Sequence, residues 1–178
     1  FNCGQTMAVR EILLLRNPIL RAKCGKVEKF NDDITGTIID LRDTLEKFRS
    51  LNGFGRGIAA PQIGLLKKII FIQTDRPMIL INPEITGRSK QKMTLWDDCF
   101  SFPEIVVKVK RHTKIKVRYA DAQGKKQVLH VVGGSSELLQ HEIDHINGIL
   151  ATDRAVDSKY IILKSEWEKF VHTPKNTF

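Results

Sequence analysis

The pentapeptide from His141 to His145 constrains this chain most, because it places two imidazoles four residues apart with a carboxylate beside the first. On an α-helix, positions i and i+4 lie one above the other, so both rings can reach one ion. Glu142 then lies at the edge of that site, where a general base would act on water. A hydrolytic metal site needs three protein ligands and one open position. The pattern therefore predicts a helix that carries two of the three protein ligands of a metal site.

The surroundings of the two histidines favour a metal site over a chance match. Both rings adjoin an apolar stripe formed by Leu139, Ile143 and Ile146, instead of lying on the opposite, solvated face of the helix. Glu142 and Asp144 add two carboxylates to the same segment. We interpret Asp144 either as an acceptor that orients a metal ligand or as a surface charge.

Length and composition indicate one domain. The chain has 178 residues, of which 42% are hydrophobic and 28% charged, which is enough to bury a single core. We expect residues 7–178 to form a single catalytic domain, and residues 1–6 to be a tail, a remnant preceding Met7 or the end of a removed leader. No apolar run approaches the roughly 20 residues of a membrane span. Three widely spaced cysteines favour a reducing compartment, so we expect a cytoplasmic protein, or an organellar one in a eukaryote.

The chain is strongly basic, with 29 Lys and Arg against 20 Asp and Glu and a net charge of +9. Such a field attracts polyanions such as RNA-rich particles. Aromatic residues are sparse among the basic clusters, so we interpret these clusters as solvated strand faces and not as a specific nucleic-acid site. The clusters occupy residues 67–68, 88–92, 108–116 and 125–126.

The spacing of apolar residues predicts a mixture of helices and antiparallel strands. Apolar residues recur at helical steps over residues 34–48, behind Asn31 and ahead of Gly53. A second helix begins at the glycine-serine segment 133–136 and carries the two histidines. Tyr160, Leu163, Trp167 and Phe170 predict a third helix. Short β-rich runs, with a hairpin turn at 121–124, predict strands at 69–73, 78–82, 105–109, 115–119 and 128–132.

Two residues compete for the role of third metal ligand. Glu166 lies on the predicted third helix, downstream of the histidines as the carboxylate does in thermolysin-like proteases. Cys99 lies upstream, in a loop with aromatic residues and a proline, and its thiolate is the stronger partner for two imidazoles. A free cysteine is also commonly just a small buried hydrophobe. The residues alone leave both alternatives open.

Three segments, taken in order, resemble the motifs of the peptide deformylases. They are GxGxAAxQ from Gly55 to Gln62, Cys-x-Ser from Cys99 to Ser101, and QHExDH from Gln140 to His145. The resemblance spans most of the chain, and the order and spacing of the motifs make it specific. It implies an α+β fold in which antiparallel sheets pack around a central helix that carries HExxH.

The resemblance also implies a role for individual residues. Cys99, His141 and His145 would bind the metal, Glu142 would act as general acid and base, and Gln62 with the Phe100 backbone N–H would stabilise an oxyanion. Gly57, Ile58, Asp98 and Leu138 would contact the substrate.

The implied reaction removes the formyl group from the formyl-methionine of nascent peptides and releases formate. The implied cofactor is one divalent ion, with Fe²⁺ favoured in vivo and Zn²⁺, Ni²⁺ or Co²⁺ as alternatives. The implied partners are N-formyl-methionyl peptides and the ribosome, without a membrane or a specific nucleic acid.

The chain departs from the family pattern near the substrate groove. It has Asp97-Asp98-Cys99-Phe100-Ser101 where the family commonly has Glu-Gly-Cys-Leu-Ser, and Arg56 stands where an apolar residue is usual. These changes bear on substrate preference more than on metal binding. Two other functions are carried as alternatives: a metallopeptidase that uses Glu166, and a noncatalytic ribosome- or RNA-associated protein whose metal stabilises the fold.

Overall fold

The computed structural model describes residues 9–171, so the predicted tail at residues 1–6 lies outside the described part of the chain. Within this part, one antiparallel sheet has the strand order β1-β2-β3-β6-β7 and a second has the order β4-β5-β8. The elements are α1 (Asp32–Asn52), β1 (Gly57–Ala59), β2 (Ile69–Gln73), β3 (Pro77–Arg88), β4 (Lys92–Asp97), β5 (Ile105–His112), β6 (Lys114–Ala120), β7 (Lys126–Val132), α2 (Gly133–Ile146), β8 (Ile161–Leu163) and α3 (Lys164–Val171). The predicted α+β fold around a central helix is confirmed.

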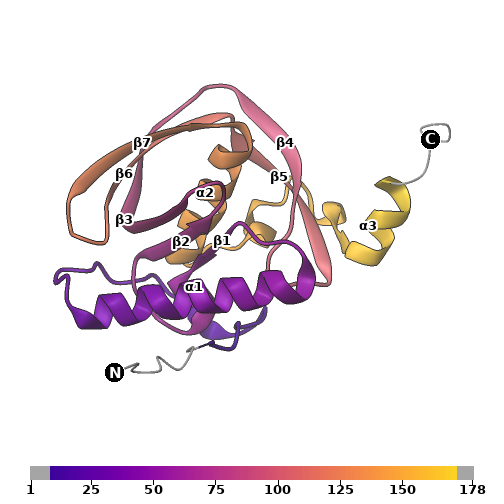
Figure 1. Ribbon diagram of the computed structural model, residues 1–178. Helices are drawn as coiled ribbons and strands as arrows, with labels where there is room; N and C mark the ends of the chain where they lie inside the picture. Colours follow the sequence, from indigo (N-terminus) through magenta and orange to yellow (C-terminus); the bar gives the residue numbers. More distant parts are fainter. Residues whose placement is uncertain (1–8, 172–178) are drawn as a thin grey trace.

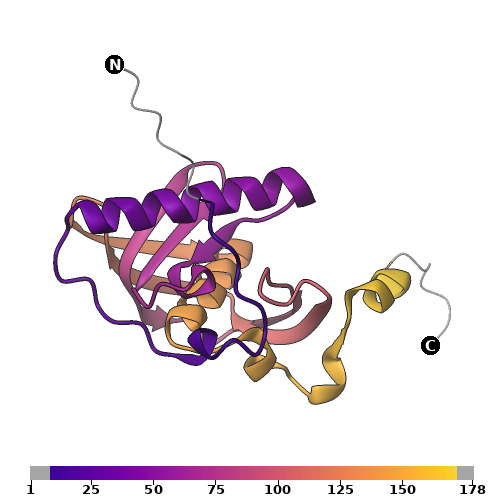
Figure 2. The same cartoon turned by 90° about the horizontal axis from the view of Figure 1, so that it is seen from below.

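Strand β2 shows why the larger sheet lies between two helices. Its residues 69–72 are all buried, which is the pattern of a strand that is covered on both faces. Ile70 and Ile72 belong to the apolar cluster that includes residues of α2, whereas Ile69 and Phe71 belong to the cluster that includes residues of α1. Figures 1 and 2 show α2 inside the curved sheet and α1 across its outer side. The larger sheet therefore covers α2, the helix that carries the histidines, with one face and α1 with the other.

The smaller sheet delivers the second part of the site. Strand β4 ends at Asp97, and the loop that follows it carries Cys99 toward α2. Cys99 belongs to a third buried cluster with Phe102, Val107 and Leu150. Because Cys99 is buried in this cluster, its thiol has little freedom to move.

The helix predicted near the C-terminus is partly wrong. Residues 161–163 form β8, which pairs with β5 so that Leu163 lies opposite Ile105, and α3 begins only at Lys164. Pairing with the free edge of β5 outweighs the helical spacing of the apolar residues, because strand propensity depends on tertiary context. Tyr160 and Trp167 still share one partner, since both rings pack edge-on against Trp96.

The other predicted elements are present, although β1 and β4 were not predicted and β3 extends beyond the predicted strand at 78–82. The predicted strand at 69–73 is β2, and the hairpin turn closes with a hydrogen bond from the Gly124 N–H to the Asp121 carbonyl, 2.9 Å. Helix α1 ends at Gly53, whose φ of 75° is the left-handed conformation that terminates helices. The helices among residues 9–171 are too short or too polar to cross a membrane.

Candidate active site

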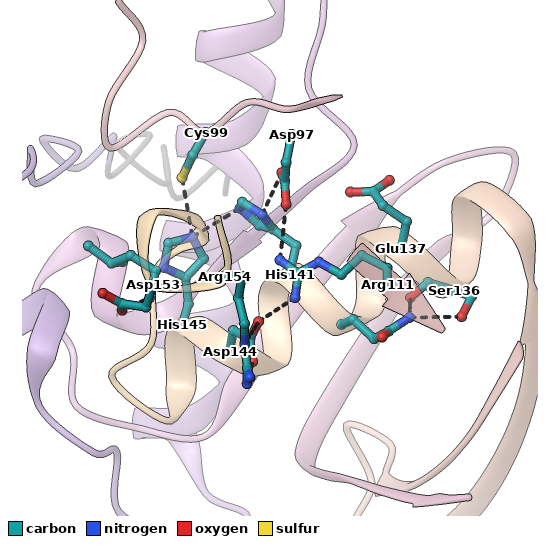
Figure 3. Close-up of polar contacts among 12 residues, drawn as sticks. Asp97, Cys99, Arg111, Ser136, Glu137, His141, Asp144, His145, Asp153 and Arg154 are labelled. Atoms are coloured by element: carbon teal, nitrogen blue, oxygen red, sulfur yellow. Dashed lines mark hydrogen bonds and ion pairs between the residues drawn. The ribbon is translucent and has the colours of Figure 1, made fainter. Parts of the chain in front are cut away.

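Cys99, His141 and His145 meet at one buried point between α2 and the loop after β4 (Figure 3). The Cys99 Sγ lies 3.2 Å from the His145 Nε2, and the Nε2 atoms of the two histidines lie 3.1 Å apart. All the candidate ligand atoms lie within 4.8 Å of one another. One sulfur and two imidazole nitrogens form a donor set that suits a four-coordinate metal with one position left for water.

Asp97 orients the first histidine. Its Oδ1 lies 2.8 Å from the His141 Nδ1, which leaves the Nε2 of that ring directed at the metal position. The Asp97 Oδ2 accepts a hydrogen bond of 3.0 Å from the buried Arg111, which also pairs with Asp144. Burial raises the pKa of Asp97, but His141 and Arg111 outweigh this effect and lower the pKa to about 2. A carboxylate behind a metal-ligating histidine fixes its ring orientation.

The protonation of the histidines fits a bound cation. Burial lowers the pKa of His145 well below its usual value, which keeps this imidazole neutral, as a metal ligand must be. Burial also lowers the pKa of His141, but its interactions with Asp97 and its hydrogen bond to Cys99 raise the pKa well above the usual value. In the protein alone, a proton on His141 therefore supplies the positive charge that these groups attract. A divalent ion would supply that charge instead, so the residues fit the implied cofactor.

Gln62 presents its amide nitrogen to the site. The Gln62 Oε1 accepts a hydrogen bond of 2.9 Å from the Ala59 backbone N–H, which fixes the orientation of the amide. The Nε2 consequently lies 3.5 Å from the Cys99 Sγ and 3.4 Å from the Ser101 Oγ. The side chain is 1% exposed, so its donors act in a medium of low dielectric constant.

Glu142 is a buried carboxyl at the edge of the site. Burial raises its pKa to about 7, because the charged form loses its hydration. Its Oε2 has no hydrogen-bond partner among the described residues. A Cβ added at Gly57 would lie 2.8 Å from the Glu142 Oε1 and 2.9 Å from the Ile72 Cδ1. Only a glycine at position 57 leaves Glu142 in this position.

A cavity of about 690 Å³ opens over these groups. Cys99, His141, Glu142 and Gln62 contribute to its lining, together with five further predicted or neighbouring residues: Gly57, Asp98, Phe100, Glu137 and Leu138. Ile58 does not line it, because its side chain is fully buried in the cluster beneath α1. Ile58 instead lies on β1, which is the edge strand of the larger sheet.

Glu166 lies outside the group of candidate ligands. It is exposed on α3, and its Oε1 accepts a hydrogen bond of 2.7 Å from Lys169. Figure 1 shows α3 projecting away from α2 and the larger sheet. Of the two alternatives for the third ligand, the structure thus favours Cys99.

Sequence reasoning missed the contacts of two cations at the site. Arg56 forms an ion pair of 2.8 Å with the nearly buried Glu137 at the cavity wall. Lys164 lies 3.5 Å from Asp98 and 4.4 Å from the ring centroid of Phe54. These contacts join segments that are far apart in the sequence, so the spacing of residues within one segment does not predict them. The buried ion pair between Arg111 and Asp97 likewise depends on the folded chain.

Comparisons with known proteins agree with this geometry. The family model of the polypeptide deformylases matches residues 9–160. A peptide deformylase from Brachyspira hyodysenteriae is 38% identical over 167 residues, which cover 89% of this chain and 87% of that protein. The crystal structure of a peptide deformylase from Thermotoga maritima superposes with a TM-score of 0.78 at 31% identity, covering 84% of this chain and 99% of the other. One from Synechococcus elongatus, in complex with actinonin, gives a TM-score of 0.80 at 30% identity, covering 86% and 82%. The chain belongs to the peptide deformylase family.

Proposed function

We propose that this chain hydrolyses the formamide of N-formyl-methionyl peptides and releases formate. The observation that carries the proposal is the group of three candidate metal ligands beside one cavity, whose lining includes two of them, Cys99 and His141, together with the Glu142 carboxyl and the Gln62 amide. A metal that only stabilised the fold would need neither Glu142 nor Gln62 beside it. The noncatalytic alternative therefore has less support than the enzyme.

Cys99, His141 and His145 would hold the ion. When bound, a divalent ion supplies Lewis acidity, which lowers the pKa of water and polarises a carbonyl group. Glu142 takes a proton from the attacking water and passes it to the nitrogen of the leaving amine. Its pKa of about 7 suits both transfers near neutral pH.

Gln62 and the Phe100 backbone N–H would stabilise the negative charge that develops on the formyl oxygen. The hydrogen bond from Ala59 holds the Gln62 amide in place before substrate binds, so little reorganisation is needed. Removing one such donor from other enzymes costs about 2.7–4 kcal/mol of transition-state stabilisation.

The peptide would lie along the cavity beside β1. Gly57 admits it close to Glu142, the edge strand offers backbone groups at Ile58, and Leu138 provides apolar surface for the methionine side chain. Asp98 is half-exposed at the rim, where its carboxylate would meet the residues that follow methionine.

We extend the proposal to the native metal ion and to the cellular compartment of the reaction. We favour Fe²⁺, with Zn²⁺ or Ni²⁺ also compatible with one thiolate and two imidazoles. The substrate places the protein in the cytoplasm, or in an organelle of a eukaryote, close to the ribosome that produces formylated chains.

Mass spectrometry of the product distinguishes this proposal from the metallopeptidase. Protein loaded anaerobically with Fe²⁺ is incubated with formyl-Met-Ala-Ser. Loss of the formyl group from an otherwise intact peptide supports the deformylase. Cleavage of an internal peptide bond, abolished by Glu166→Gln and retained in Cys99→Ala, would contradict it.

A further inference from the structure

A second cavity, of about 810 Å³, lies on a different side of α2 from the candidate active site. Residues of β3, β6 and β7 line it, as do Ile143 and Asn147 at the C-terminal end of α2. We call it the basic groove, because its lining in the described part of the chain has five cationic side chains and one carboxylate, that of Glu84. These cations are Lys26, Lys68, Arg88, Arg118 and Lys126.

Four of the five cations are unpaired within the described part of the chain. Arg118 pairs with Glu84 at 2.7 Å, whereas no ion pair among residues 9–171 involves Lys26, Lys68, Arg88 or Lys126. The hydrogen bond and charge of Arg118 lower the pKa of Glu84, and Lys26 and Lys68 lower it further. The positive charges therefore act on a common region, with an excess that their one carboxylate does not balance.

The backbone holds these cations together, although they come from distant parts of the sequence. The side chain of Asn82 exchanges two hydrogen bonds with the backbone of Val27, at 2.9 and 2.8 Å. Gly25 pairs with the segment before β2, where the Lys68 N–H donates to the Gly25 carbonyl at 3.0 Å. Lys26 is thereby fixed beside Lys68. Because the backbone already holds these two lysines side by side, binding a ligand does not have to order the backbone there.

We propose that the basic groove binds the phosphate groups of a polyanionic ligand. Four unpaired cations on separate elements match several phosphates in a row better than one isolated anion. The interpretation of these lysines as mere solvated strand faces does not account for their convergence in one hollow. The phosphodiester backbone of RNA and a short inorganic polyphosphate both supply this chemistry.

Binding is measured by fluorescence anisotropy with labelled single-stranded RNA, with tripolyphosphate and poly-glutamate as competitors. Each phosphate contact contributes about −0.7 to the slope of log affinity against log salt, so four contacts give about −2.8. Raising monovalent salt from about 50 to about 200 mM should weaken RNA binding about 50-fold. Stronger competition by tripolyphosphate than by unlabelled RNA would identify a small polyphosphate as the ligand. Stronger competition by unlabelled RNA would identify RNA.

Two variants test the place of binding. Replacing Lys26, Lys68 and Lys126 by Gln leaves one unpaired cation, so the same change of salt should weaken binding only about threefold. The control replaces Lys47, Lys110 and Lys159 by Gln, which removes equal charge outside the groove. Equal losses in both triple variants, or competition by poly-glutamate as strong as by the phosphates, would overturn the proposal.

Glu84→Gln tests the groove in the opposite direction. This change releases Arg118 and removes the one carboxylate that lines the groove among residues 9–171, so RNA binding should strengthen and the salt slope should steepen by about 0.7. A misfolded variant would not gain affinity. Unchanged or weaker binding by Glu84→Gln would also count against the groove.

Discussion

Replacing Arg111 by Met should be among the most destabilising single changes in this protein. Arg111 is 3% exposed and bridges Asp97 and Asp144, and its removal leaves buried carboxylates without their main partner. Breaking a buried ion pair in this way costs about 3–5 kcal/mol. Asp144 keeps Arg154 at 2.9 Å, so the loss falls mainly on Asp97 and should lie near the lower limit, about 3 kcal/mol.

The assay is equilibrium unfolding in urea, and Arg118→Met provides the matched control. Arg118 pairs with Glu84 at 2.7 Å, but both side chains are more than half exposed, so this change should cost less than about 1 kcal/mol. Asp97 also orients His141, and the affinity of Arg111→Met for the metal should fall about 10- to 100-fold. A loss of stability no larger than that of Arg118→Met would refute the reasoning.

Three further predictions concern single positions. Gly57→Ala should lower kcat/KM about 100-fold at unchanged metal content, because the new Cβ would displace Glu142; equal kinetics would contradict the close contact. Gln62→Leu should lower kcat about 100- to 1000-fold with little change in KM, and a change confined to KM would argue against an oxyanion donor. Burial raises the pKa of Cys24 to about 11, so its labelling by iodoacetamide in the folded protein should be negligible at pH 8 and increase toward pH 11, as peptide mapping would show.

The helices and the central strands could be predicted because their information is local. The apolar spacing of α1 and the stripe on α2 each lie within one element, and the run that forms β2 is unbroken. The C-terminal segment was misread because its fate depends on β5, with which residues 161–163 pair. Periodicity within a segment does not reveal whether a strand edge is available elsewhere in the fold.

The candidate site likewise has one part that the sequence predicts locally and another part that depends on the folded chain. The i, i+4 geometry of His141 and His145 is set by one helix, so the pattern alone indicates a shared ion. The choice between Cys99 and Glu166 depends on the packing of a loop and of α3, which the spacing of residues does not determine. The family resemblance indicated Cys99, and the structure places that residue beside both histidines. The convergence of Lys26 with Lys68 and Lys126 likewise required the folded chain.

The central claim is that Glu142 performs hydrolysis at the site formed by Cys99, His141 and His145. The most direct test measures formate release from formyl-Met-Ala-Ser by Fe²⁺-loaded protein and by Glu142→Gln at equal metal content, under anaerobic conditions that protect the thiolate. We predict that the unmodified protein releases one formate for each free peptide amine that it produces. The variant should release formate at a rate about 100- to 10,000-fold lower. Equal rates in the two proteins, or no formate from fully loaded protein, would contradict the account.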